Sequence, residues 1–240
     1  MALKLIKEGS LLPVDDPELL ELNKFSSGQE EILMEWINGQ FWLHSDNPKE
    51  RPIGIGIDRE LLRHEEFFKK SSIQKELLAR AIGIKGSYRP KVLDLTGGML
   101  GDSLLLLSFG CEVWTSERHP VMRFLIESAL QNSSHPRLKN FHFLGGDALS
   151  LLQNPPSVDV IYFDPMFEDP NEKTSPRKEM RIFRNLVGKD LDAIEVFKEA
   201  RKVGPKRLVV KRPRLSDFLL EKPSVEYQGK STRYDVYFSL

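Results

Sequence analysis

Asp164, Pro165 and Phe167 are residue types that suit chemistry on a flat base bearing an exocyclic amine. They follow the apolar run in 158–164, which is typical of a buried parallel strand, and ligands of open α/β sheets bind beyond the carboxyl ends of such strands. There, Asp164 and the Pro165 carbonyl would accept the amine hydrogens while Phe167 stacks on the base. A strand followed by a proline turn is also common where no chemistry occurs, so this catalytic assignment depends on the rest of the chain.

A glycine-rich turn, 96–102, follows a second strand-like run at 91–95, which contains Asp94. Glycines such as Gly98 and Gly101 let a backbone approach a ligand at a helix N-terminus. An Asp before such a turn fits S-adenosylmethionine (SAM), whose amino-acid moiety presents an ammonium and a carboxylate. A dinucleotide turn would instead bring backbone amides to a pyrophosphate. The alternative is a strand–turn–helix junction that binds nothing.

Two further strand-like runs are followed by acids. Glu117 closes the run 111–117, about twenty residues after Gly97, where an acid holds ribose hydroxyls in doubly wound folds. Asp147 follows the run 139–144 and would accept from an adenine amine. Each acid alone is more often a solvated strand end or a helix N-cap. Their succession along the chain nevertheless favours a nucleoside-containing cofactor.

The composition is that of a globular protein, with 240 residues, of which 40% are hydrophobic and 29% charged. This length fits one doubly wound domain with a small appendage. We expect no signal peptide, no membrane span and no metal, and we expect a cytoplasmic protein. The one cysteine, Cys111, begins a predicted buried strand and is expected to be part of the core.

The net charge is zero, but the charge is unevenly distributed. Residues 1–66 hold 14 acidic and 7 basic residues, whereas 201–214 holds seven basic residues and no acid. Localised positive charge indicates contact with a phosphate backbone. The alternative is a solvated helix face with basic residues at helix C-termini. The candidate RNA-binding residues are Arg177, Lys178, Arg181, Lys211, Arg212 and Arg214.

The chain divides into a small N-terminal α+β region, 1–66, and a larger domain, 67–240. In the first we expect a helix over 18–38 and an antiparallel pair of strands at 40–45 and 52–58. In the second, strands and helices alternate, which predicts a parallel Rossmann-like α/β sheet. A C-terminal hairpin would complete the seven strands typical of class I SAM-dependent methyltransferases. The predicted strands are 91–95, 111–117, 139–144, 158–164, 207–211, 225–228 and 232–239, and the helices 71–83, 101–109, 120–131, 147–153, 176–187 and 190–203.

Several motifs occur in an order typical of one family. They are Ala81-Ile82-Gly83-Ile84-Lys85-Gly86-Ser87-Tyr88, Asp94-x-Thr96-x-Gly98, Asp102, Gly110-Cys111, Glu117-Arg118-x-Pro120, Asp164-Pro165-Met166-Phe167, Lys178-Glu179-Met180-Arg181-x-Phe183 and Val209-Val210-Lys211-Arg212-Pro213. From about residue 80 onward the chain resembles the bacterial ribosomal RNA small subunit methyltransferase J family, which forms N2-methylguanosine in 16S rRNA.

The resemblance implies a set of SAM-binding residues, to which the turn itself adds Asp94 and Gly98. The chain departs from the family at Leu100, where the family has a second turn glycine, at Gly101, where it has arginine, and at Asp147-Ala148, where it has two serines. The contacts carried over from the family are Gly101, Asp102, Glu117, Arg118, Asp147, Ala148 and Asp164.

The resulting expectation is an enzyme that transfers a methyl group from SAM to the N2 atom of a guanosine in 16S rRNA or in the small ribosomal subunit. Two alternatives stay open. The chain could methylate another exocyclic amine, such as that of adenine or cytosine in RNA or DNA, since Asp-Pro-x-aromatic does not distinguish the bases. It could also be a non-catalytic relative that binds SAM or RNA.

Overall fold

The computed structural model describes residues 3–7, 10–11, 32–37, 40–44, 52–166 and 190–239. The chain forms two compact units, which are treated separately below. Of the described residues, those within 1–57 and 119–133 form the small unit, and those within 58–118, 134–166 and 190–239 form the sheet unit.

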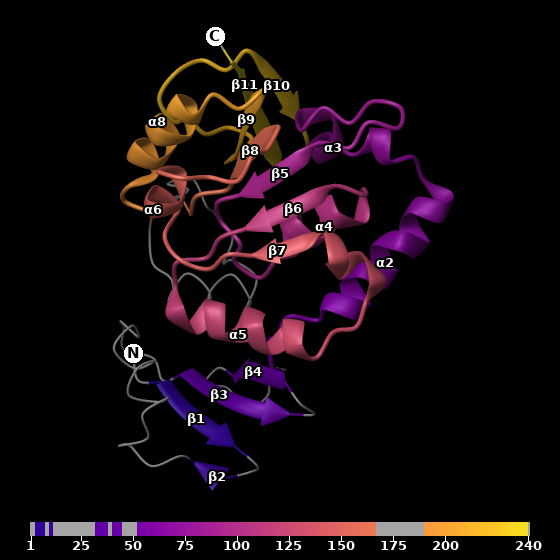
Figure 1. Ribbon diagram of the computed structural model, residues 1–240, viewed down its shortest axis with the longest axis vertical. Helices are drawn as coiled ribbons and strands as arrows, with labels where there is room; N and C mark the ends of the chain where they lie inside the picture. The colour runs from indigo at the N-terminus through magenta and orange to yellow at the C-terminus, as the bar shows by residue number, and fades with distance from the viewer. Residues whose placement is uncertain are drawn as a thin grey trace. The chain divides into compact units, whose positions relative to one another are not determined.

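The sheet unit is built on a seven-stranded sheet of strand order β10-β11-β9-β8-β5-β6-β7 (Figure 1). Five neighbouring strands are parallel, and the β10–β11 hairpin is antiparallel to itself and to β9. The predicted sheet and hairpin are therefore confirmed. The strands are β5 (Lys91–Asp94), β6 (Glu112–Thr115), β7 (Phe141–Phe143), β8 (Val160–Phe163), β9 (Arg207–Pro213), β10 (Val225–Gln228) and β11 (Thr232–Phe238).

One face of this sheet packs against α6 (Ala148–Leu152) and α8 (Ala193–Val203), which lie next to each other (Figure 1). The apolar residues of α8 recur at helical spacing, and Gly204, in the left-handed conformation, ends the helix. The core on this face consists of Leu93, Leu95, Ala148, Leu152, Ile161, Phe163, Ala193, Val196, Phe197, Ala200, Leu208, Val210 and Tyr237.

The alternate strand residues point to the opposite face, where α3 (Leu77–Ala81) contacts β10 and β11, and α4 (Gly101–Ser108) contacts β6. Tyr162 and Val209 are Cα partners on this face and are both buried. Because both faces are covered, the inner strands are continuous apolar runs, as in other parallel sheets.

The sheet unit also contains α2 (Ile57–Lys70), a helix that was not predicted. Its start falls within 52–58, where a strand was expected. Ile57, Leu61 and His64 are buried at helical spacing, and acidic residues in the first turn and lysines in the last favour the helix dipole. Two short 3-10 helices, η1 (Ile73–Lys75) and η2 (Pro136–Asn140), complete the unit's described elements.

The small unit contains a four-stranded sheet of order β2-β1-β3-β4 and the helix α5 (Pro120–Gln131). Its strands are β1 (Leu3–Lys7), β2 (Ser10–Leu11), β3 (Ile32–Ile37) and β4 (Gln40–His44). The backbone N–H of Phe41 donates to Ser128 Oγ of α5 (3.2 Å), and the Phe41 ring lies 4.7 Å from that of Phe124. Strand β4 and helix α5 therefore pack together.

The N-terminal predictions were partly wrong. The helix expected over 18–38 is contradicted by β3, which pairs with both β1 and β4; residues 18–31 lie outside the described ranges. The apolar residues of this segment fit helical spacing, but β3 forms its backbone hydrogen bonds with a neighbouring strand on each side. The expected strand over 52–58 is reduced to one antiparallel bridge, Leu43–Ile53. The chain passes closely there, because a Cβ on Gly54 would lie 2.6 Å from the Trp42 ring.

Candidate active site

The glycine turn after β5 packs directly on the end of β6. The Gly97 N–H donates to the Ser116 carbonyl (2.8 Å), and the Gly98 N–H donates to Glu117 Oε2 (2.8 Å). A Cβ on Gly97 would lie 2.8 Å from Thr115 Cγ2 and 2.9 Å from the Ser116 carbonyl oxygen. Glycine is therefore required at 97, and Glu117 helps to hold the turn. A contact from Glu117 to a ribose diol remains a prediction.

Asp94 lies beneath the turn and is 1% exposed. Its Oδ1 accepts from the Thr96 N–H (2.9 Å), and its Oδ2 accepts from Ser103 Oγ, which lies 2.8 Å from Thr115 Oγ1. Burial raises the pKa of Asp94 to about 7, against the lowering effect of these two hydrogen bonds. In this structure Asp94 joins the turn to α4, and a direct cofactor contact remains a prediction.

Leu100 and Gly101 form the junction between the turn and α4. Leu100 has φ 62°, which costs a non-glycine residue roughly 1–2 kcal/mol, and its side chain is 0% exposed. Burial of the side chain offsets that strain. A Cβ on Gly101 would have no heavy atom within 4 Å, so the helix begins beside open space. This opening fits the amino-acid end of SAM, to which the backbone would be accessible.

The centre of the site is an ion cluster of Asp102, Lys211 and Asp164, supported by Tyr162. Lys211 Nζ donates to Asp102 Oδ2 (2.7 Å) and to Asp164 Oδ2 (2.7 Å). Tyr162 Oη donates to Asp102 Oδ2 (2.6 Å). The side chains of Asp102, Lys211 and Asp164 are 23%, 27% and 35% exposed, so the cluster is only partly open to solvent. One ammonium thus bridges two carboxylates.

This arrangement shifts the acid–base properties of the cluster. Burial raises the pKa of Asp164 to about 6, and the charge of Asp102 adds to the rise while that of Lys211 opposes it. Burial alone would lower the pKa of Lys211, but the charges of Asp164 and Asp102 raise it above its ordinary value. Lys211 is therefore charged at every physiological pH, whereas Asp164 takes up a proton just below physiological pH.

The turn after β8 is fixed on two sides. The Asp164 N–H donates to Thr96 Oγ1 (2.8 Å), and the Met166 N–H donates to Asp190 Oδ2 (2.6 Å). Asp190 also accepts from Arg118, whose Nη1 lies 2.9 Å from both carboxylate oxygens of Asp192. Arg118, a predicted cofactor contact, thus anchors the segment that positions the Asp164 turn. Pro165 is buried in that turn, and Phe167 lies outside the described residues.

Asp147 is the N-cap of α6. Its Oδ1 accepts from the N–H groups of Leu149 (2.9 Å) and Ser150 (3.2 Å), as expected for the capping alternative. The neighbouring Ala148 is buried at 8% exposure. A contact from Asp147 or Ala148 to an adenine remains a prediction. Beside them Gly146, with φ 77°, has no atom near the position of a Cβ, so this strand end also borders open space.

The basic residues of 201–214 do not form one exposed surface. Lys211 belongs to the ion cluster, and Arg212 is 8% exposed, with Nε and Nη2 donating to the Asp217 carbonyl (3.2 and 2.9 Å). Arg214 is exposed. Three further candidates, Arg177, Lys178 and Arg181, lie outside the described residues.

Sequence reasoning missed the roles of Thr96, Tyr162 and Asp190 and the pairing of Lys211. One signal was available: Lys211 continues the apolar run Leu208-Val209-Val210 within a strand, and a lysine on a covered strand is rarely unpaired.

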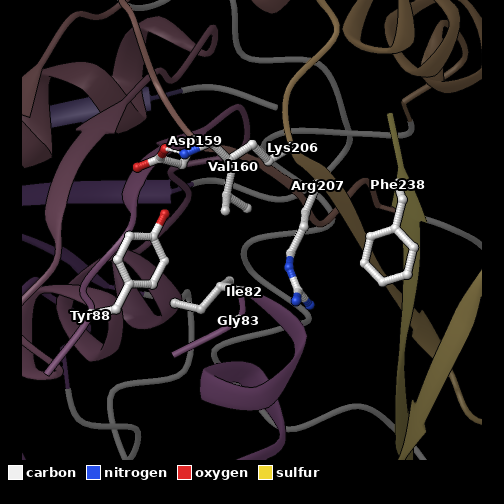
Figure 2. A pocket seen from close by; sticks show the side chains of 8 residues that line it. All are labelled: Ile82, Gly83, Tyr88, Asp159, Val160, Lys206, Arg207 and Phe238. Atoms are coloured by element: carbon white, nitrogen blue, oxygen red, sulfur yellow. Dashed lines mark hydrogen bonds and ion pairs between the residues drawn. The ribbon is translucent and has the colours of Figure 1, made fainter. Parts of the chain in front are cut away.

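A cavity of about 430 Å³ lies at the other end of the strands (Figure 2). Lys206 Nζ lies 2.6 Å from Asp159 Oδ1, and Arg207 donates to the Ala81 carbonyl (3.1 Å) and stacks over Phe238. Val160, which begins β8, lines this cavity, whereas Asp164 follows the end of β8. The charged side chains that line this cavity bind other groups of the protein. None of the predicted site residues lines the cavity. The remaining lining residues are Ile82, Gly83 and Tyr88.

The comparisons with known proteins agree with this geometry. The model of a family described as "Putative SAM-dependent methyltransferase" matches residues 20–239. Ribosomal RNA small subunit methyltransferase J of Laribacter hongkongensis is 44% identical over 171 residues, which cover 68% of this chain and 61% of that protein. Its namesake in Dechloromonas aromatica is 36% identical over 228 residues, which cover 90% and 91%.

A solved SAM-dependent methyltransferase from Neisseria gonorrhoeae has a TM-score of 0.62 and 26% identity, covering 89% of this chain and 84% of that one. In the described part of this chain, no helix is long and apolar enough to cross a membrane. Nor do those residues include a group of three or more His, Cys, Asp or Glu side chains placed to hold a metal ion.

The residues at the carboxyl edge of the sheet fit the cofactor that these relatives use. Carboxylates at Asp102 and Glu117 match an ammonium and a ribose diol, and the backbone at Gly101 is open. The strand order places this edge where open α/β sheets bind their ligands. The family model covers most of the chain, and the relatives are well above 30% identity. The chain is therefore a SAM-dependent methyltransferase that belongs to the ribosomal RNA small subunit methyltransferase J family.

Proposed function

We propose that this enzyme methylates the exocyclic N2 atom of a guanosine in 16S rRNA. The observation that carries the proposal is the Asp164-Pro165 turn, held at the carboxyl end of β8 beside the glycine turn and Asp102. The substrate class comes from the relatives, which are named for methylation of small-subunit ribosomal RNA. Free 16S rRNA and the assembled small subunit are both candidate partners, and the proposed site of action is the cytoplasm.

When bound, SAM supplies an electrophilic methyl group on a sulfonium. The protein's task is to present a weak nucleophile, because the guanine N2 lone pair is delocalised into the ring. Lys211 occupies Oδ2 of Asp164, so Oδ1 and the Pro165 carbonyl would accept the two amine hydrogens. That arrangement favours a pyramidal nitrogen whose lone pair is available for attack. Phe167 would stack on the base and fix its plane.

Positioning should supply most of the catalysis. Alignment of two reactants at near-attack distance is worth roughly 7–11 kcal/mol of barrier. As the N–C bond forms and the methyl group leaves sulfur, the amine must lose one proton. Asp164, with a pKa of about 6, is ionised at neutral pH and would take that proton. A base buried in RNA structure would first have to be exposed, at a cost of a few kcal/mol.

RNA docking would use exposed basic residues. Arg214 is the exposed described candidate, and Arg177, Lys178 and Arg181 are further candidates from the sequence. Their charges would neutralise backbone phosphates and make binding dependent on salt. The proposed cofactor contacts are Asp94, Gly98, Gly101, Asp102, Glu117, Arg118, Asp147, Ala148 and Asp164.

The test is transfer of labelled methyl from SAM to small subunits isolated from cells that lack this enzyme. The modified RNA is digested and its nucleosides are identified by mass spectrometry. We expect N2-methylguanosine with the wild-type enzyme and background incorporation with Asp164→Asn. A methylated adenosine or cytidine would show that the target base is adenine or cytosine and not guanine. SAM binding without any transfer to RNA would contradict the proposed function.

A further inference from the structure

Lys211 lies in the ion cluster, although its basic neighbours suggested a phosphate contact. It stands on β9 with Tyr234 of β11 as its Cα partner, on the sheet face that also carries Asp94 and Tyr162. Its side chain reaches two carboxylates on different elements, Asp102 of α4 and Asp164 after β8, at 2.7 Å each. The lysine therefore ties the cofactor turn to the turn that would hold the target amine.

We propose that Lys211 is a positioning residue for methyl transfer, which holds Asp164 through Oδ2 and keeps it ionised so that Oδ1 faces the target amine. The proposal rests on the proposed function, because it concerns Asp164 as the acceptor of the guanine amine hydrogens. Lys211 is not itself placed against the substrate. Its role is exerted through the carboxylate that it orients.

The charges around Asp164 explain why a cation is needed. The cluster holds two carboxylates and one ammonium, so removal of Lys211 would leave two negative charges facing each other in a partly buried site. Two carboxyl groups that each lie 2.7 Å from one nitrogen cannot both ionise readily once that nitrogen is removed, so Asp164 would take up a proton. A protonated Asp164 loses acceptor capacity. The charged and titratable groups that face the cluster are Asp94, Asp102, Tyr162, Asp190, Lys211 and Tyr234.

Contact with an RNA phosphate is the competing role for Lys211. The side chain is 27% exposed, and two of its three donor positions are directed at carboxylates. A phosphate would have to displace one of these partners. Lys206 on the same segment is a matched control, because it is also paired with an aspartate, at 2.6 Å, but is 72% exposed at the opposite end of the strands.

The experiment compares Lys211→Met, Lys211→Arg and Lys206→Met in three measurements. The first is the pKa of the Asp164 carboxyl, followed by carbon NMR in protein without RNA. The second is the pH dependence of single-turnover transfer. The third is the salt dependence of RNA binding. The NMR measurement requires no turnover, so a failure of the proposed function remains distinguishable from a failure of the Lys211 proposal.

We expect Lys211→Met to raise the pKa of Asp164 by about 1–3 units, since an opposite charge is lost. The rise of turnover with pH should move upward by the same amount, so that activity lost near neutral pH returns in alkaline buffer. Lys211→Arg should keep a wild-type midpoint, and the slope of RNA affinity against salt should be unchanged. Lys206→Met should alter none of the three.

Two results would overturn the proposal. One is an unchanged pKa of Asp164 in folded Lys211→Met. The other is a salt slope reduced by nearly one unit, which would identify a phosphate contact. If Lys211→Met does not fold, Asp102→Asn supplies the opposite test. Removal of the competing carboxylate should lower the pKa of Asp164, and an unchanged or raised value would equally reject the role of Lys211.

Discussion

Acidification is expected to slow methyl transfer by protonating Asp164 while the protein stays folded. Burial raises the pKa of this carboxyl to about 6, with Lys211 opposing the rise and Asp102 and Asp190 adding to it. A carboxyl with that pKa is about 97% ionised at pH 7.5 and about 9% ionised at pH 5.0. If only the ionised form accepts the amine hydrogens, turnover falls about tenfold between these two pH values.

The free energy of unfolding should rise on acidification, where activity falls, as far as Asp94 and Asp164 contribute to it. Asp94, with a pKa of about 7, and Asp164, with a pKa of about 6, both bind protons more tightly in the folded chain than in the unfolded chain. Their contribution to the free energy of unfolding therefore grows as the pH falls from about 7 to about 4. Loss of activity at pH 5 is thus not expected to arise from unfolding through these two acids.

The assay is single-turnover transfer between pH 5.0 and 8.5 at constant ionic strength. Near-ultraviolet circular dichroism and SAM calorimetry at each pH monitor the fold and cofactor binding. Asp159→Asn is the matched control, because Asp159 lies at the other end of β8 and is paired with Lys206; it should keep the wild-type profile. Asp164→Asn should be slow at every pH and lack the rise. A flat wild-type profile, or an Asp164→Asn profile that rises as before, would refute the reasoning.

Three further predictions concern the turn, the cofactor and RNA. Gly97→Ala should lose about 1–3 kcal/mol of unfolding free energy in urea, because its Cβ would meet Thr115 and the Ser116 carbonyl, whereas Gly101→Ala, which faces open space, should gain about 0.4–1 kcal/mol. Equal effects would contradict the packing of the turn. Glu117→Ala should weaken SAM binding in calorimetry by about 1.5–3 kcal/mol; Glu112→Ala, at the start of β6, should not. Arg177→Glu with Arg181→Glu should flatten the salt dependence of RNA binding without changing SAM affinity, and an unaltered slope would reject that docking surface.

The sheet was predictable because each inner strand is a short apolar run followed by a turn or cap residue. The runs that end near Asp94 and Asp164 are covered on both faces, so their sequences show little besides apolar residues until the strand ends. The error at 32–37 has the same origin. A short apolar run with helical spacing also fits a paired strand, and only the partners β1 and β4 decide between them.

The ion pairs of the site were not predictable from local pattern. Arg118 is 72 and 74 residues from its partners Asp190 and Asp192, and Lys211 is 109 residues from Asp102. The pairing of Lys211 with Asp164 exists because the strand order places β9 beside β8, and Asp102 in the first turn of α4 reaches the same lysine. Local periodicity indicates which residues form a strand. The pairing of charges depends on which strands are neighbours, and periodicity does not indicate that.

The acids at the strand ends show how a shared position can lead to different roles. Asp94 accepts from Thr96 and Ser103 and so holds the turn, and Asp147 caps α6 with one oxygen. Asp164 instead accepts from a lysine at one oxygen, Oδ2, and we propose that the other accepts from the target amine. A carboxylate that accepts from the N–H and O–H groups of its own turn supports the fold, whereas one that a lysine from another strand holds at one oxygen is suited to act on a ligand. In the proposed mechanism, the lysine on β9 therefore distinguishes Asp164 from the other strand-end acids.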